Sequence, residues 1–197
     1  MTTARRTARF ALCVAPVALM ALTSFAQLNL QPESRLWIDG TSTVRSFTCS
    51  AKDVQATIPA EADAVGALLA GEKAVQSADV KIAAGKIDCG NGTMNGHMYK
   101  ALKVEQNPTI ELKVASYEMA AANGTITGKL NGTLTIGGVT KPVTIAATGK
   151  KDGAGLRVTG TYPVNMKEYG LKPPTLMLGT LKVNELVKVS FDLLLND

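Results

Sequence analysis

One long alternating stretch near the middle of the chain constrains the fold most. In residues 126–136, apolar residues and glycines alternate with polar residues, which is the pattern of a strand with one dry face. Gly137 and Gly138 allow the positive backbone angles of a tight turn, and the alternation resumes over residues 143–147. Because proline cannot donate to a strand ladder, we expect Pro142 at a strand start or edge. The stretch therefore predicts an antiparallel β-hairpin.

Other segments alternate in the same way and indicate about eight long strands. They cover residues 36–59, 80–84, 110–114, 156–166 and 187–195. In the first segment the parity of the apolar residues changes at Lys52 and Asp53, as at a β-bulge or bend. Alternation of this length favours a closed tube over a two-sheet sandwich, whose strand ends would leave apolar side chains protruding. We therefore predict an all-β fold, an eight-stranded antiparallel β-barrel.

Two short segments predict helices. Residues 64–70 read as a short helix within a loop, and apolar residues recur at helical spacing between Cys89 and Pro108, at Met94, Met98 and Leu102. We expect this second helix to lie across one opening of the barrel. Its methionines would either line an entrance for a ligand or simply fill the end of the barrel. His97 falls on another face, and we expect it to be solvated.

The first 26 residues predict a cleaved secretory signal peptide. Arginines begin the segment, a short apolar run covers residues 10–22, and small residues at 23–26 suit a cleavage site after Ala26. An uncleaved anchor is the alternative. Cleavage would leave residues 27–197 as one domain without a stable membrane span, in the periplasm or secreted.

The positive charge of the chain depends largely on this leader. The full sequence has 21 basic and 16 acidic residues, and loss of the three leader arginines reduces the net charge from +5 to +2. The remaining lysines are scattered singly along the predicted strands. Because nucleic-acid surfaces cluster basic and aromatic residues, we do not expect a nucleic-acid partner.

Cys49 and Cys89 are the two cysteines outside the leader, and a pair in an exported protein favours a disulfide. Two free buried thiols are the alternative. A metal site is disfavoured because His97 is the single histidine and no metal-ligand spacing is present. The predicted loop closure would stabilise the fold by roughly 4 kcal/mol.

Five segments together resemble the YceI-like family of periplasmic, lipocalin-like barrels that bind polyisoprenoid or related lipids. The most specific are the hairpin Gly132–Ile145 and the segment Ala101–Leu112 with its Pro-Thr-Ile sequence. Trp37–Val44 resembles the first strand of the family, and Val158–Asn165 and Val187–Leu195 resemble its closing strands. The resemblance implies a lipocalin-like barrel that carries or sequesters an isoprenoid lipid or quinone. The short helix predicted from the spacing would lie at one opening of this barrel.

The residues expected to contact such a ligand are apolar positions on the inward faces of the strands and on the helix. They are Phe47, Ile82, Met94, Met98, Leu102, Ile110, Leu112, Val114, Leu134, Ile136, Val143, Ile145, Tyr162, Val164 and Phe191. Small inward residues such as Gly128, Gly132 and Gly160 would either leave space for a hydrocarbon or permit the strands to coil. A polar headgroup would lie at the mouth, near Arg45, Lys100, Arg157 or Lys167.

No motif in the sequence indicates an enzyme. A nucleophile elbow and a complete phosphate-binding loop are both missing, and a Ser-His-Asp arrangement would have to use His97. We therefore expect no catalytic residues, no metal and no cofactor other than the bound lipid itself. The alternative to a carrier is an exported structural or interaction module whose barrel is filled by its own side chains. A homodimer is possible for either.

Overall fold

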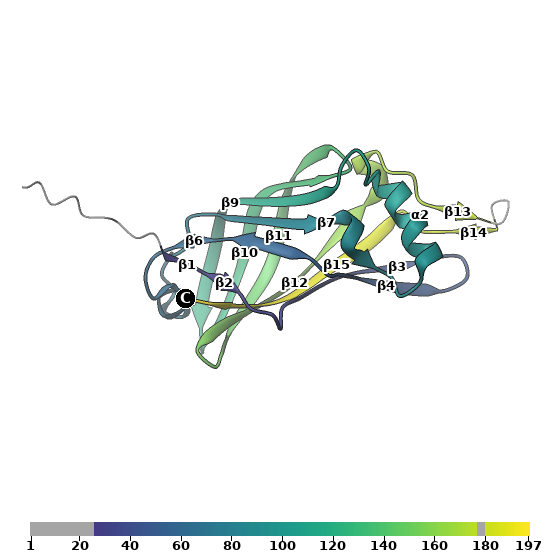
Figure 1. Ribbon diagram of the computed structural model, residues 1–197. Coiled ribbons are helices and arrows are strands. Elements are labelled where there is room, and N and C mark those ends of the chain that lie inside the picture. The colour runs from purple at the N-terminus through teal and green to yellow at the C-terminus, as the bar shows by residue number, and fades with distance from the viewer. Residues whose placement is uncertain (1–25, 177–179) are drawn as a thin grey trace, which may run out of the picture.

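The structure is a computed structural model that describes residues 26–176 and 180–197. The predicted signal peptide, residues 1–26, lies outside the described residues except for Ala26. The described chain forms one curled antiparallel sheet with a helix at each end (Figure 1). The predicted all-β, lipocalin-like barrel is thus confirmed, with differences in how its strands are divided.

The main sheet contains eleven strands in the described residues. These are β2 (Asn29–Leu30), β3 (Arg35–Thr41), β4 (Ser46–Ala51), β5 (Val54–Thr57), β7 (Ala78–Ala83), β8 (Ile87–Asp88), β9 (Thr109–Ala122), β10 (Thr125–Ile136), β11 (Val139–Asp152), β12 (Gly155–Asn165) and β15 (Leu186–Asn196). Their order is β5-β7-β9-β10-β11-β12-β15-β3-β4-β8, with β2 added on β15. Two further pairs, β1 (Ala26–Gln27) with β6 (Pro59–Ala60) and β13 (Thr175–Leu176) with β14 (Leu181–Lys182), form separate small sheets.

Interruptions explain why eleven strands appear where eight were predicted. β4 and β5 are the two halves of one predicted strand, divided at Lys52 and Asp53, where the change in parity indicated a bend. β4 pairs with β3 and β8, whereas β5 pairs with β7, so the two ends of the sheet meet at this bent strand. At the break, the backbone N–H of Lys52 donates to Lys86, and that of Ala83 donates to Asp53. The barrel is closed along this line.

The predicted central hairpin is formed by β10 and β11. Gly137 and Gly138 make its two-residue turn with φ angles of 56° and 83°, which side chains with a Cβ rarely adopt. The second strand begins at Val139, earlier than expected, and contains Pro142. There β11 is paired with β10 alone, because its pairing with β12 is restricted to residues 147–152. The missing N–H of Pro142 therefore costs no hydrogen bond on the open side.

The helices lie at opposite ends of the barrel (Figure 1). α1 (Ala64–Ala70) lies near the C-terminus, and α2 (Gly92–Leu102) lies at the other end, where it contacts residues 84–86. Two 3-10 turns, η1 (Ala84–Lys86) and η2 (Met166–Tyr169), follow β7 and β12. Where β11 and β12 part, Tyr169 and Leu171, at and just after the end of η2, are buried with 3% of their surface exposed. The connection after β12 therefore contributes to the wall of the barrel.

The barrel interior is divided into two hydrophobic clusters. At the α1 end, one cluster of buried side chains includes Leu28, Ile58, Leu68, Ile126 and Leu195. At the α2 end, a second cluster contains buried residues of β7, β9, β10, β11 and β12, with α2 packed against it. No residue of the first cluster borders the cavity described next.

Candidate ligand-binding cavity

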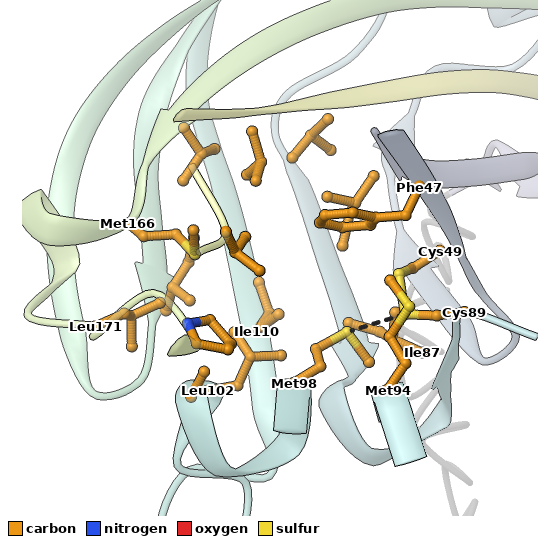
Figure 2. Close-up of a pocket in the computed structure, with 18 of the residues that line it drawn as sticks. Phe47, Cys49, Ile87, Cys89, Met94, Met98, Leu102, Ile110, Met166 and Leu171 are labelled. Atoms are coloured by element: carbon orange, nitrogen blue, oxygen red, sulfur yellow. Dashed lines mark hydrogen bonds between the residues drawn. A yellow bond between two sulfur atoms is a disulfide. The ribbon is translucent and has the colours of Figure 1, made fainter. Parts of the chain in front are cut away.

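A cavity of about 380 Å³ occupies the α2 half of the barrel. This volume lies within the range of roughly 300–1,000 Å³ that is usual for small-molecule sites. Its wall consists mostly of inward-facing apolar side chains of the main sheet, and α2 covers one side (Figure 2). The strands contribute Leu36, Ile38, Phe47, Val80, Ile82, Ile87, Ile110, Leu112, Leu134, Ile136, Ile145, Tyr162, Val164, Val187, Val189 and Phe191. The arrangement suits an apolar ligand.

Helix α2 presents a wide face to this cavity. Met94, Met98 and Leu102 point into it as the spacing predicted, and His97 and Ala101 line it as well. The expectation that His97 would be solvated is wrong, because it follows Met94 by three residues and lies on the edge of the same face. The helix begins at an N-cap, Asn91, whose side-chain oxygen accepts a hydrogen bond of 3.0 Å from the Met94 N–H. No residue of α2 is fully buried, so the helix covers the cavity without belonging to its core.

A disulfide between Cys49 and Cys89 joins α2 to the sheet, as predicted. Cys49 lies on β4, and Cys89 precedes the N-cap of α2 by two residues. Both sulfur atoms lie at the cavity wall, and Met98 Sδ is 3.7 Å from Cys89 Sγ (Figure 2). A disulfide sulfur has no proton to donate, so this is a packing contact. The bridge fixes the N-terminal end of α2 to the barrel.

Two phenylalanines fill the space that small inward residues leave. The ring of Phe47 lies over Gly40, its direct partner on β3, and the ring of Phe191 lies over Gly160, its partner on β12. A Cβ added to either glycine would come within 2.4 Å of a ring carbon. Gly132 is different, since an added Cβ would lie 1.9 Å from the Lys113 carbonyl oxygen on β9. These inward glycines therefore permit close packing of rings and strands, and they do not enlarge the cavity.

Thirteen of the fifteen residues that sequence analysis singled out line this cavity, and Val114 and Val143 do not. Both are buried, with 7% and 5% of their surface exposed. They are the two neighbours of Gly132 in the sheet, one on β9 and one on β11. Alternation identified their inward face, but it carries no information on how far along the barrel the cavity extends.

The long connection between β12 and β15 also contributes to the cavity, which the sequence did not predict. Met166, Leu171, Pro174, Leu181 and Val183 from this connection all line the cavity. Apolar residues in this connection do not recur at a regular strand or helix spacing, so the sequence predicted a loop. The one available signal is local, because Leu181 and Val183 alternate with polar residues.

Polar residues at the cavity border come from the β3–β4 turn and from α2. They are Ser42, Arg45, Asn91, Thr93 and His97. Of the basic residues proposed to meet a headgroup, Arg45 alone borders the cavity.

The other three basic candidates lie elsewhere. Lys100 is exposed on α2, and Lys167 forms an ion pair with Glu185. Arg157 donates to Asp192 at 2.7 Å and to Asp152 at 2.5 Å, and these bonds raise its pKa above its ordinary value. Arg157 thus serves an ion-pair network on the outer face of the sheet.

The arrangement of residues 26–176 and 180–197 also bears on two other functions, metal binding and membrane spanning. No group of three or more His, Cys, Asp or Glu side chains in this part of the chain is placed to hold a metal ion. None of its helices combines the length and the apolar character needed to cross a bilayer.

Comparison with known proteins identifies the domain. The model of the YceI-like domain matches residues 34–195. Three solved structures share the fold. BcnA of Burkholderia cenocepacia has 18% identity and a TM-score of 0.65, covering 84% of this chain and 99% of its own. A polyisoprenoid binding domain from Saccharophagus degradans has 13% identity and a TM-score of 0.59, covering 86% and 97%. The Campylobacter jejuni YCEI protein has 19% identity and a TM-score of 0.59, covering 76% and 84%. No curated protein sequence matches the chain.

Proposed function

This chain belongs to the YceI-like family, and from that premise we propose that it is an exported carrier that holds an isoprenoid lipid or a quinone in its barrel. The observation that carries the proposal is the apolar cavity of about 380 Å³ beneath α2. The description of the Saccharophagus degradans structure as a polyisoprenoid binding domain supports the same class of ligand. No covalent chemistry is required of the protein in this role.

Transfer energetics explain why such a cavity retains a lipid. Burial of one CH₂ group contributes about 0.8 kcal/mol, so a five-carbon isoprene unit contributes roughly 4 kcal/mol before the cost of ordering the chain. The methionines of α2 have flexible, polarizable side chains that adapt to irregular hydrocarbon shapes. The ligand tail would therefore lie against Met94 and Met98 on one side and the sheet on the other.

The disulfide supports the proposed location outside the cytoplasm. Disulfides form and persist in oxidising compartments such as the periplasm, and the sequence of residues 1–26 has the features of an export signal. The alternative, a module whose barrel is filled entirely by its own side chains, agrees with the α1 half of the interior. It does not account for the cavity in the α2 half.

The test is extraction of the protein, purified without detergent, with organic solvent and analysis of the extract by mass spectrometry. We expect a co-purifying isoprenoid or quinone. Ala101→Trp would fill the cavity from α2 and weaken ligand binding. A loss of about 1.4 kcal/mol of binding free energy would lower the affinity, and with it the yield of co-purified ligand, about tenfold. Ala120→Trp, on an exposed position of β9, is the matched control and should keep the wild-type yield. Clean extracts together with no uptake of a fluorescent lipophilic probe would refute the proposal.

A further inference from the structure

The two ends of the barrel differ in charge. Among the described residues, the connections at the α2 end carry seven basic side chains and four acidic ones; the basic ones are Arg45, Lys86, Lys100, Lys103, Lys167, Lys172 and Lys182. Counted in the same way, with the strand ends at the β11–β12 turn included, the α1 end carries three basic side chains and six acidic ones. The basic ones are Lys73, Lys150 and Lys151, and the acidic ones are Glu33, Glu61, Asp63, Glu72, Asp152 and Asp197. A net charge of +3 at one end thus faces −3 at the other. This distribution of charge gives the molecule an electric dipole along the barrel axis, which would orient it in an external field.

The basic end also carries exposed apolar side chains. Val44, with 70% of its surface exposed, and Leu186, with 57%, are the large apolar residues most open to solvent in the described part of the chain. Val44 borders the cavity, together with Arg45 and Leu181. Apolar side chains flanked by basic ones are the composition of surfaces that bind lipid interfaces.

The turn that carries Val44 is held in place by hydrogen bonds. Ser42 Oγ accepts from the N–H groups of Val44 and Arg45, at 3.3 and 3.2 Å, and donates to the Arg45 carbonyl at 2.9 Å. The turn is also bonded to β14, since the Thr43 N–H donates to the Lys182 carbonyl at 2.9 Å and Thr43 Oγ1 accepts from the Lys182 N–H at 3.2 Å. The turn that carries Val44 and Arg45 therefore lies beside β14, the strand that carries Lys182, on one projection of the barrel (Figure 1). Val44 and Arg45 border the cavity.

We propose that this projection docks the cavity end of the protein onto a bilayer that contains anionic lipids. Val44 enters the interface, and Arg45 and Lys182 contact the headgroups while the acidic α1 end faces away. This inference deepens the proposed function and depends on it, because the cavity would then take its ligand directly from the membrane surface. The charge at the two ends is what selects a bilayer over an apolar protein partner.

Vesicle binding tests the orientation. The probe is co-sedimentation with phosphatidylcholine vesicles made with and without phosphatidylglycerol, at low and high salt. We expect binding that requires phosphatidylglycerol and weakens with salt. Each basic residue near an anionic surface contributes about fivefold to binding, so Arg45→Glu with Lys182→Glu should weaken it at least about 25-fold. Val44→Asp should weaken it as well.

The matched control changes the same amount of charge at the far end. Lys150→Glu with Lys151→Glu alters two exposed lysines near the β11–β12 turn and should leave binding within about twofold of wild type, since they lie beyond the screening length from the bilayer. Equal losses in the two double variants, or binding that ignores both phosphatidylglycerol and Val44→Asp, would overturn the inference.

A fluorescence measurement locates the contact directly. Trp37 is the single tryptophan, so Val44→Trp in a Trp37→Phe background reports on the projection alone. Its emission should shift to the blue and be quenched by brominated lipids, whereas Ala120→Trp in the same background should show neither effect. Uptake of a lipophilic probe without vesicles tests the cavity separately. Normal uptake with no vesicle binding would therefore refute docking and leave the carrier role standing.

Discussion

Removal of the disulfide should destabilise the protein and loosen α2 in particular. The perturbation is Cys49→Ala with Cys89→Ala, because serine would leave a hydroxyl at a site with 1% exposure. The two cysteines are 40 residues apart, and in the chain-entropy model a loop of this length costs about 4 kcal/mol of stability when it is opened. A domain is typically stable by about 5–15 kcal/mol, so the change removes a large share of the total.

Urea unfolding of the wild type and the variant measures this difference. Amide hydrogen exchange then shows which elements of the variant are destabilised. Because α2 has no fully buried residue and its N-terminal end is tied to β4 by the bridge, its amides should lose protection before those of the sheet. Leu28→Ala is the matched control, since it should cost about 2–5 kcal/mol at the opposite end of the barrel and leave the difference in protection between α2 and the sheet as it is in the wild type. A difference below about 1 kcal/mol between wild type and the cysteine variant would refute the loop-closure reasoning.

Three other measurements follow from the structure. Leu28→Ala should leave uptake of a lipophilic probe unchanged despite its cost in stability, because Leu28 belongs to the cluster that does not border the cavity; a large loss of uptake in the folded variant would show that the two halves are coupled. Asp39 has a lowered pKa, chiefly because Thr48 Oγ1 donates to it at 2.7 Å, so its contribution to stability is present above the unfolded pKa of about 3.9 and is lost as the pH falls through the folded pKa. NMR titration of Thr48→Val should find the pKa of Asp39 raised, and an unchanged value would contradict this assignment. Burial raises the pKa of Tyr169 to about 12, so its contribution is present below pH 10 and is lost as the pH rises from about 10 to 12. Ultraviolet titration should show one tyrosine that ionises near pH 12 in the wild type and is missing in Tyr169→Phe.

Alternation in the sequence was sufficient to predict most of the sheet and the inward faces of its strands. Each residue of a strand points to the face opposite its neighbour, so Phe47, Ile110 and Ile136 could be assigned to the interior without coordinates. The parity change at Lys52 and Asp53 likewise located the bend at which the barrel closes. The direction of a side chain along a strand and the position of a bend depend on neighbouring residues, so the sequence pattern predicts both.

The extent of the cavity could not be predicted, because it depends on side chains that are distant in sequence. The ring of Phe191 occupies the space above Gly160, and Tyr169 and Leu171 fill the gap where β11 and β12 part. The alternation of apolar residues and their size do not distinguish an inward residue that lines the cavity from one that is packed in the filled half.

The filled α1 half of the barrel limits how any occupant moves. A hydrocarbon chain cannot pass through the protein from end to end, since Leu28, Ile126 and Leu195 are packed across its path. The part that enters first must leave last, and a molecule longer than the cavity leaves its remaining length outside. The protein would consequently distinguish such molecules only by the end of the ligand that enters the cavity. Release of the ligand would require the opening of the barrel beside α2 to be free.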